Sequence, residues 1–328
     1  MLIFTLPRAV QMRLYKAFGL AGGLSLLPLS SYAQDCSGKF YVETQEQLDI
    51  IGANCPVING SILINGSFTG PFVLNGVRNI TQNFVISMWH EFSASHPTSI
   101  DLPDLESVDR IYLPDLAASS FSAPKLWTAE SLTLGQAAPG SEVNLESLVR
   151  VGRGLTLIGK YSTVHLPSLE TVNGSLEIYS VDKRGIFETH SSIASAMNLT
   201  IPSLTTATRM NLAVKAEAIS FPNLQTLVQD DEDRSEIVIR VLEAPAPVSF
   251  PQLSSLGGDL RLEGNITSHG LLYEIQLATA NGAFHPSLDL SSLQNTSQYI
   301  YIDTHNTLNV DLPIRNIGRL SMTGPIDE

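Results

Sequence analysis

Cysteines, basic residues and long apolar runs are all scarce in this sequence. Its 328 residues include 2 cysteines and 19 Lys and Arg against 32 Asp and Glu, and aromatic residues make up 7%. An excess of negative charge repels phosphate backbones and anionic lipid surfaces, so we expect no nucleic-acid partner. Two cysteines without a neighbouring His or a second pair leave a tetrahedral zinc site half empty, which disfavours a metal site.

The apolar run at residues 17 to 29 is too short to cross the roughly 30 Å hydrocarbon core of a membrane as a helix. Basic residues precede the run at Arg8, Arg13 and Lys16, and the small residues Ser31 and Ala33 follow it. This order is typical of a secretory signal peptide, so we predict that residues 1 to 33 are cut off after Ala33 and that the protein is secreted. A membrane anchor is the competing interpretation. Removal of the segment leaves 16 Lys and Arg against 32 Asp and Glu, so the mature chain is more acidic.

Both cysteines lie near the start of the mature chain, in a compartment that oxidises thiols, so we predict a disulfide between Cys36 and Cys55. The same compartment attaches N-linked glycans, and Asn-x-Ser/Thr sequons recur after the predicted signal peptide. They lie at Asn59, Asn65, Asn79, Asn173, Asn198, Asn265 and Asn295. We therefore predict a glycoprotein, although several of these sequons are Asn-Gly-Ser sequences that a turn-rich fold would also use.

A short pattern recurs along the chain and is seen whole in LPSLETVNGSLEIYS, residues 166 to 180. Its apolar residues step by three from Leu169 to Val172, and then by two from Leu176 to Ile178, which is the spacing of a half-buried strand. The Asn-Gly between these pairs predicts a turn, with one strand ending and another beginning. Copies begin roughly every 20 to 30 residues, the period range of solenoid proteins. They are found at 123–134, 145–157, 201–212, 250–262 and 290–302, with weaker copies at 102–113, 221–229 and 312–322.

Short strands and turns, with almost no helical periodicity, are predicted from about residue 57 to 322. Strands of successive copies would pair in parallel and stack their Leu, Ile and Val side chains in columns, which predicts an all-β parallel β-helix over residues 34–328. The prolines at the corners should lie where strands start or bend, because proline cannot donate to a strand ladder. Thr44 and Gln47 form a capping-box pattern, so we also predict a short helix at about 45–53 that covers the first rung.

Two segments interrupt the period, residues 181 to 198 and residues 267 to 286, and the second has the pattern of a short helix. Insertions in a solenoid lie in loops on one face and are frequent binding sites. A tolerated excursion of the chain explains them equally well.

The opening DCSGKFYVETQEQLDIIGANCPVINGSILING, residues 35–66, together with the repeated P-x-L-x-x-V-x-G-x-L-x-I, resembles receptor L domains. More specifically, the chain is similar to fungal cell-wall organisation and sporulation proteins that carry this domain. The resemblance covers about residues 35 to 322 and implies a right-handed β-helix in a glycosylated surface protein without catalytic residues. Such proteins commonly end in a hydrophobic tail for a glycosylphosphatidylinositol anchor, whereas this chain ends in the polar RLSMTGPIDE. We expect either a released member of the family or a sequence that continues further.

Pectin-degrading enzymes also use β-helices, so a polysaccharide-active hydrolase or lyase is the alternative function. Such an enzyme needs several carboxylates that converge on one groove. The densest acidic stretch runs from Asp230 to Glu236, but its carboxylates are contiguous rather than spread over successive rungs. The Asp-x-Asp-x-Asp-Gly register of a calcium loop is also missing from it. We interpret this stretch as a solvated loop.

Other catalytic patterns are missing as well. The histidines include no His-x-x-x-His pair, and the sequence has no Gly-x-Ser-x-Gly elbow, so neither a zincin nor a serine hydrolase is indicated. Trp89, His90, Phe92 and Trp127 could stack on a sugar ring or could instead cover the core. We therefore predict a non-enzymatic secreted or cell-surface glycoprotein that contributes to fungal cell-wall organisation and needs no cofactor. Its expected partner is a cell-wall polysaccharide or a surface protein.

Overall fold

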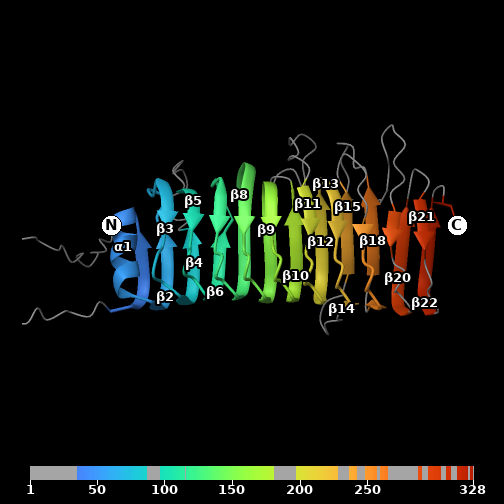
Figure 1. Cartoon of the computed structure of the whole chain (residues 1–328), viewed down its shortest axis with the longest axis horizontal. Helices are drawn as coiled ribbons and strands as arrows, with labels where there is room; N and C mark the ends of the chain where they lie inside the picture. The colour runs from blue at the N-terminus through green and yellow to red at the C-terminus, as the bar shows by residue number, and fades with distance from the viewer. Residues whose placement is uncertain are drawn as a thin grey trace, which may run out of the picture. The chain divides into compact units, whose positions relative to one another are not determined.

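The computed structural model describes twelve stretches of the chain, and the predicted signal peptide lies outside them. They are residues 35–86, 97–114, 116–180, 197–227, 236–241, 248–256, 259–264, 287–289, 295–303, 308–311, 316–323 and 326–327. Residues 34–328 form one compact unit, in which strands stack side by side from the N-terminal to the C-terminal end (Figure 1). The paired strands in the described part of the chain all run parallel to their neighbours.

The first ladder of strands contributes one strand per rung, interrupted in two of the later rungs. It consists of β1 (Ser37–Val42), β2 (Val57–Ile64), β4 (Asn79–Ile86), β6 (Ser107–Leu113), β8 (Thr128–Asn144), β9 (Arg150–His165), β10 (Thr171–Tyr179), β12 (Thr206–Val214), β14 (Thr226–Leu227) with β15 (Glu236–Val241), β17 (Ser255–Leu256) with β18 (Asp259–Gly264), β20 (Asn295–Asp303) and β22 (Asn316–Thr323).

The second ladder is formed by the strand that follows the corner of each rung. It consists of β3 (Gly70–Val73), β5 (Pro97–Asp101), β7 (Ser120–Ser122), the ends of β8 and β9, β11 (Met197–Thr200), β13 (Ala216–Ser220), β16 (Val248–Ser249), β19 (Ser287–Asp289), β21 (Leu308–Asp311) and β23 (Ile326–Asp327). Because β8 and β9 run through the corner, they join β3, β5 and β7 to the first ladder in one curled 17-stranded sheet.

Buried hydroxyl groups satisfy backbone carbonyls where β8 and β9 turn the corner. The Ser141 hydroxyl donates to the carbonyl of Ala118 at 2.8 Å, and the Tyr161 phenol donates to the carbonyl of Leu134 at 3.1 Å. Burial raises the pKa of the Tyr161 phenol, so this side chain remains a neutral donor. Each bond gives a buried hydroxyl group a backbone acceptor from the preceding rung.

The proline-containing part of the repeat forms the turn from the second ladder back to the first. In Leu166-Pro167-Ser168-Leu169 the N–H of Leu169 donates to the carbonyl of Leu166 at 3.5 Å, and other rungs form the same bond three residues apart. Proline at the second position of such a turn already has the required φ, and it forms no ladder bond there. The predicted position of the prolines at bends is confirmed for Pro103, Pro114, Pro124, Pro167, Pro202, Pro222 and Pro251.

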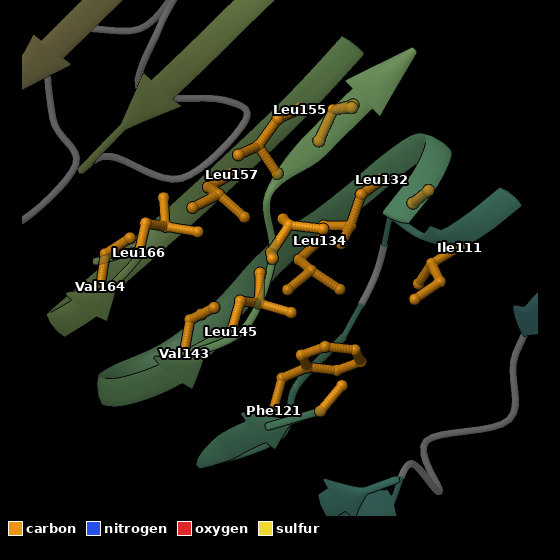
Figure 2. Close-up of a cluster of buried hydrophobic side chains, with 14 of the residues drawn as sticks. Ile111, Phe121, Leu132, Leu134, Val143, Leu145, Leu155, Leu157, Val164 and Leu166 are labelled. Carbon is orange, nitrogen blue, oxygen red and sulfur yellow. The ribbon is translucent and has the colours of Figure 1, made fainter. Parts of the chain in front are cut away.

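Apolar side chains stack in columns through the interior, as the repeat predicts. In the first ladder, one column contains Leu132, Leu155 and Leu176, which are paired in register and fully buried. Figure 2 shows the side chains of neighbouring rungs pointing into the same interior space from both ladders. At about 25 cal/mol per Å² of buried apolar surface, these columns are the main favourable contribution to folding. The predicted inward residues Leu169, Val172, Leu176 and Ile178 are all at most 1% exposed.

The Asn-Gly in the middle of the repeat was wrongly predicted to separate two strands. Residues 171 to 179 form the single strand β10, and a shift in register between Val172 and Ser175 marks a bulge at Asn173-Gly174. A Cβ atom at Gly174 would overlap the carbonyl oxygen of Arg153 in the preceding rung. Glycine is therefore needed here for close approach between rungs rather than for a turn.

The two predicted interruptions agree with the register of the first ladder. Leu176 pairs with Met210, and Leu260 pairs with Ile300, and these are the two longest steps between successive paired positions of this column. The extra residues therefore lie in the two predicted segments, which fall outside the described residues apart from Met197 and Asn198 at the start of β11. The helix predicted within the second segment also lies outside them.

Helix α1 (Gln45–Asn54) confirms the predicted capping helix. Thr44 is its N-cap residue, and the Gln47 side chain accepts bonds from the N–H groups of Glu43 and Thr44 at 2.7 and 3.3 Å. Leu48 and Ile51 are buried on its inner side. The amide of Gln45 bonds both backbone groups of Val73, so this side chain supplies the hydrogen bonds that another strand would offer to the edge of β3.

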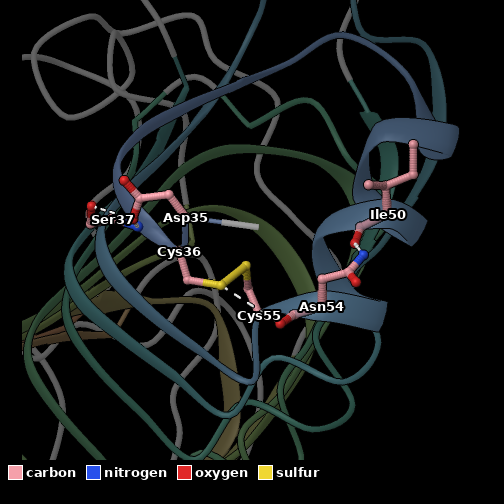
Figure 3. The surroundings of a disulfide bond; sticks show 6 residues. All are labelled: Asp35, Cys36, Ser37, Ile50, Asn54 and Cys55. Carbon is pink, nitrogen blue, oxygen red and sulfur yellow. Dashed lines mark hydrogen bonds between the residues drawn. A yellow bond between two sulfur atoms is a disulfide. The ribbon is translucent and has the colours of Figure 1, made fainter. Parts of the chain in front are cut away.

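The predicted disulfide is present and links the two elements of the cap. Cys36 precedes β1 and Cys55 follows α1, and their sulfur atoms are 2.04 Å apart (Figure 3). Strand β1 covers the first ladder and α1 covers the second, so the bond joins the two halves of the terminal rung. The fold is therefore an all-β, solenoid-like stack of parallel strands with a helical N-terminal cap.

Candidate binding surface

The side chains at the predicted glycosylation sites are at least partly exposed wherever the structure describes them. Asn59 and Asn173 are exposed, and Asn65 and Asn79 are half-buried. Asn198 is the second residue of β11 and Asn295 is the first residue of β20, but their side chains are not described. Asn265 lies outside the described residues. The four described side chains come from the outer surface of the first ladder or from the ends of its strands.

Exposed apolar side chains line up across the first four strands of the first ladder. Tyr41, Leu63, Val85 and Tyr112 are paired in register on β1, β2, β4 and β6, and we call this row the tyrosine stripe. Tyr41 is 58% exposed and Tyr112 is 40% exposed, while Leu63 and Val85 are half-buried. The alternation of strand side chains places these residues on the outer face, because the residues on either side of each one point into the core.

Sequence reasoning missed the tyrosine stripe, although a signal for it exists. Each contributing strand has three consecutive apolar residues, as in Phe40-Tyr41-Val42, whereas a strand with one buried face should alternate. On β8, β9, β10 and β12 the middle residue is polar, as in Leu132-Thr133-Leu134 and Leu176-Glu177-Ile178. The change from an apolar to a polar middle residue marks where the stripe ends.

Polar and charged side chains border the tyrosine stripe two residues earlier on each strand. Lys39 and Arg110 are exposed at the ends of this border. Between them, the Ser61 hydroxyl accepts from the backbone N–H of Asn83 at 3.3 Å and donates to the Gln82 side chain at 3.2 Å. An apolar row beside the exposed side chains of Lys39, Gln82 and Arg110 is suited to a ligand that has both apolar and hydrogen-bonding faces.

Trp127 is the second exposed aromatic feature, at the edge where the turns enter the first ladder. Its side chain is 53% exposed, so it does not cover the core. The backbone N–H of Trp127 donates to the carbonyl of Glu106 in the preceding rung. The backbone carbonyl of Trp127 accepts from the N–H groups of Val149 and Arg150 in the next rung. The backbone of Trp127 is thus fixed on both sides. Its indole ring presents a flat apolar surface to solvent.

Ion pairs between adjacent rungs run along the same edge. Lys125 contacts Asp104 at 2.8 Å, and looser pairs join Arg78 to Glu106 and Arg153 to Glu130 at 3.9 and 3.8 Å. The Lys125 ammonium and the N–H of Gly76 together hold the pKa of Asp104 below its ordinary value. Because all three pairs are exposed, each contributes less than about 1 kcal/mol to stability. Their charged groups lie along the same edge as Trp127 and can hydrogen-bond a ligand.

The residues considered for sugar stacking or for catalysis are mostly outside the described part of the chain. Trp89, His90 and Phe92 lie outside it, as does the acidic stretch except for the backbone of Glu236 at the start of β15. His165 is exposed at the end of β9. Among the described residues, no three His, Cys, Asp or Glu side chains are grouped as metal ligands would be.

No helix in the described stretches is both long and apolar enough to span a membrane. Comparison with known proteins gave no match to a family model, to a curated protein or to a solved structure. The exposed aromatic side chains and the scaffold that holds them are therefore the features from which a function can be inferred.

Proposed function

We propose that this chain is a non-enzymatic, secreted or cell-surface glycoprotein whose solenoid is a scaffold for binding cell-wall polysaccharide. In this proposal residues 1–33 are a signal peptide, and the fold is a right-handed β-helix of the receptor L-domain type. The biological role is the one implied by the resemblance to fungal cell-wall organisation proteins. The disulfide in the cap supports an oxidising, extracellular compartment. The parallel ladders support a scaffold role, because their hydrogen bonds hold the chain in one rigid stack.

The exposed side chain of Trp127 is the observation that carries the proposal. Its backbone is bonded to the rungs on both sides, so no backbone segment has to be ordered when a ligand packs on the ring. Sugar rings have an apolar C–H face and equatorial hydroxyl groups, which match an aromatic surface bordered by charged hydrogen-bonding groups. Glu106 and Arg150 supply such groups on the two adjacent rungs, and Arg78 pairs with Glu106 from one rung further away.

Co-sedimentation of the purified, glycosylated protein with insoluble cell-wall glucan and chitin tests the proposal. We expect the protein to pellet with at least one polymer and Trp127→Ala to weaken this binding about tenfold or more, the order of a lost aromatic stack. Ile50→Ala is the control and should bind like the wild type, because Ile50 is also an exposed apolar residue but lies on helix α1 rather than beside Trp127. Equal binding by wild type and Trp127→Ala, or no binding to either polymer, would contradict this role of Trp127.

A further inference from the structure

The N-terminal end of the tyrosine stripe lies beside a predicted glycosylation site. Leu63 lies in β2, and Asn65 follows it by two residues, just beyond the end of the strand. The two side chains are therefore on the same face, about 6.6 Å apart along the chain. Tyr41 pairs in register with Leu63 on the adjacent strand, about 4.8 Å away. The exposed ring of Tyr41 is therefore one of the nearest apolar surfaces to the Asn65 side chain.

Two hydrogen bonds fix the direction of the Asn65 amide. Its Nδ2 donates to Oε1 of Glu43 at 2.7 Å, and its Oδ1 accepts from the N–H of Ser67 at 3.4 Å. Glu43 follows Tyr41 by two residues, so the amide nitrogen is directed across the ladder toward the tyrosine side. A glycosylated asparagine keeps one of its two N–H hydrogens, so the bond to Glu43 can persist after modification.

We propose that an N-linked glycan on Asn65 covers the Tyr41–Leu63 end of the tyrosine stripe, with its first sugar packed on the Tyr41 ring. The inference rests on the proposed function, because only a secreted chain meets the lipid-linked oligosaccharide pyrophosphate that donates the glycan. In the transfer a bond forms between Asn65 Nδ2 and C1 of the sugar, the bond from C1 to the phosphate oxygen breaks, and Nδ2 loses one proton. The lipid pyrophosphate is the leaving group.

The chemistry of the first sugar explains why it would cover this end. N-acetylglucosamine presents an apolar C–H face and an acetamido methyl group, both suited to an aromatic ring and a leucine side chain. A row of exposed apolar residues is unfavourable in water, and covering it stabilises the folded chain. The glycan needs no ordering of a separate partner, because Asn65 already tethers it beside the ring.

Thermal midpoints test the inference in proteins with and without Ser67→Ala, in the wild-type, Tyr41→Ala and Tyr41→Phe backgrounds, all produced through a secretory pathway that attaches glycans. Ser67→Ala removes the sequon but keeps Asn65 and its bond to Glu43. We expect Ser67→Ala to lower the midpoint by about 2 °C in the wild-type background, and by less than half of that in the Tyr41→Ala background. Tyr41→Phe keeps the ring, so the full effect of Ser67→Ala should remain in that background. Equal shifts in the wild-type and Tyr41→Ala backgrounds would overturn the inference.

The matched control is Thr81→Ala, which removes the sequon of Asn79 at an exposed position of β4. Asn79 lies about 20 Å along its strand from Val85, so the effect of Thr81→Ala should be the same with and without Tyr41. Peptide mass spectrometry reports which sequons carry glycans. An unmodified Asn65 beside modified Asn59 or Asn173 overturns this inference alone, whereas a protein with no glycan at any sequon overturns the proposed glycoprotein as well.

Discussion

At the scale of single residues, neighbouring positions on a strand have opposite roles. Leu176 is fully buried in a column between Leu155 and Met210, whereas Glu177 is on the outer face and half-buried. This alternation accounts for nearly all of the core, because every rung repeats it in register. On the first four strands the middle residue is apolar and belongs to the tyrosine stripe, and on β15 the middle residue Val238 is apolar and buried.

Replacing Leu176 with Asp should destabilise the protein by about 4 kcal/mol or more, because the carboxylate would be buried without a partner. Glu177→Lys should change the free energy of unfolding by about 0.5 kcal/mol or less, since its side chain reaches solvent. Urea denaturation of the two variants measures both effects. Similar losses in the two variants would show that the register of β10 is wrong.

At the scale of elements, the cap differs from every other rung because a helix replaces the strand of the second ladder. Gln45 bonds the edge of β3, and the capping box fixes the start of α1. The terminal rung can be covered in this way because a short helix closes the core without offering a second free strand edge. The disulfide joins α1 to β1, so the two parts of the cap should be lost together.

Replacing Cys36 and Cys55 together with Ser should therefore lower the free energy of unfolding by about 3 kcal/mol, the chain-entropy value for a loop of this length. Most of the strand signal in circular dichroism should remain, because the ladders beyond β2 do not depend on the bond. Ile50→Ser is the control, because Ile50 is 51% exposed on the outer side of α1. A double cysteine variant as stable as wild type would remove the disulfide from our account of the cap.

The repeat was predictable from the sequence because each rung contains its own core positions and its own proline turn. Cys36, Cys55 and the capping helix were also predictable, since disulfide chemistry and capping are local. The bulge at Asn173-Gly174 was not, because the need for glycine comes from Arg153 in the neighbouring rung. The tyrosine stripe was not predicted for the same reason, since only the register between strands brings Tyr41 and Tyr112 into one row.

At the scale of the whole molecule, stacking places one outer face of many strands in a single surface. Residues far apart in the sequence, such as Tyr41 and Tyr112, become parts of one row because each strand lies about 4.8 Å from the next. The same geometry could align carboxylates on successive rungs for an enzyme. On β8, β9 and β10 the row that contains the stripe instead continues with Thr133, Thr156 and Glu177, with a single carboxylate among them.

Product analysis with cell-wall polymers tests the central claim, that the solenoid binds without catalysis, most directly. Purified, glycosylated protein is incubated with glucan, chitin and pectin, and reducing sugars and unsaturated products are measured beside the bound fraction. We predict binding to at least one polymer and no product from any of them, in the wild type and in a variant with Asp230, Asp231 and Asp233 changed to Asn. Release of product by the wild type, and its loss in the triple variant, would contradict the scaffold and establish the enzyme.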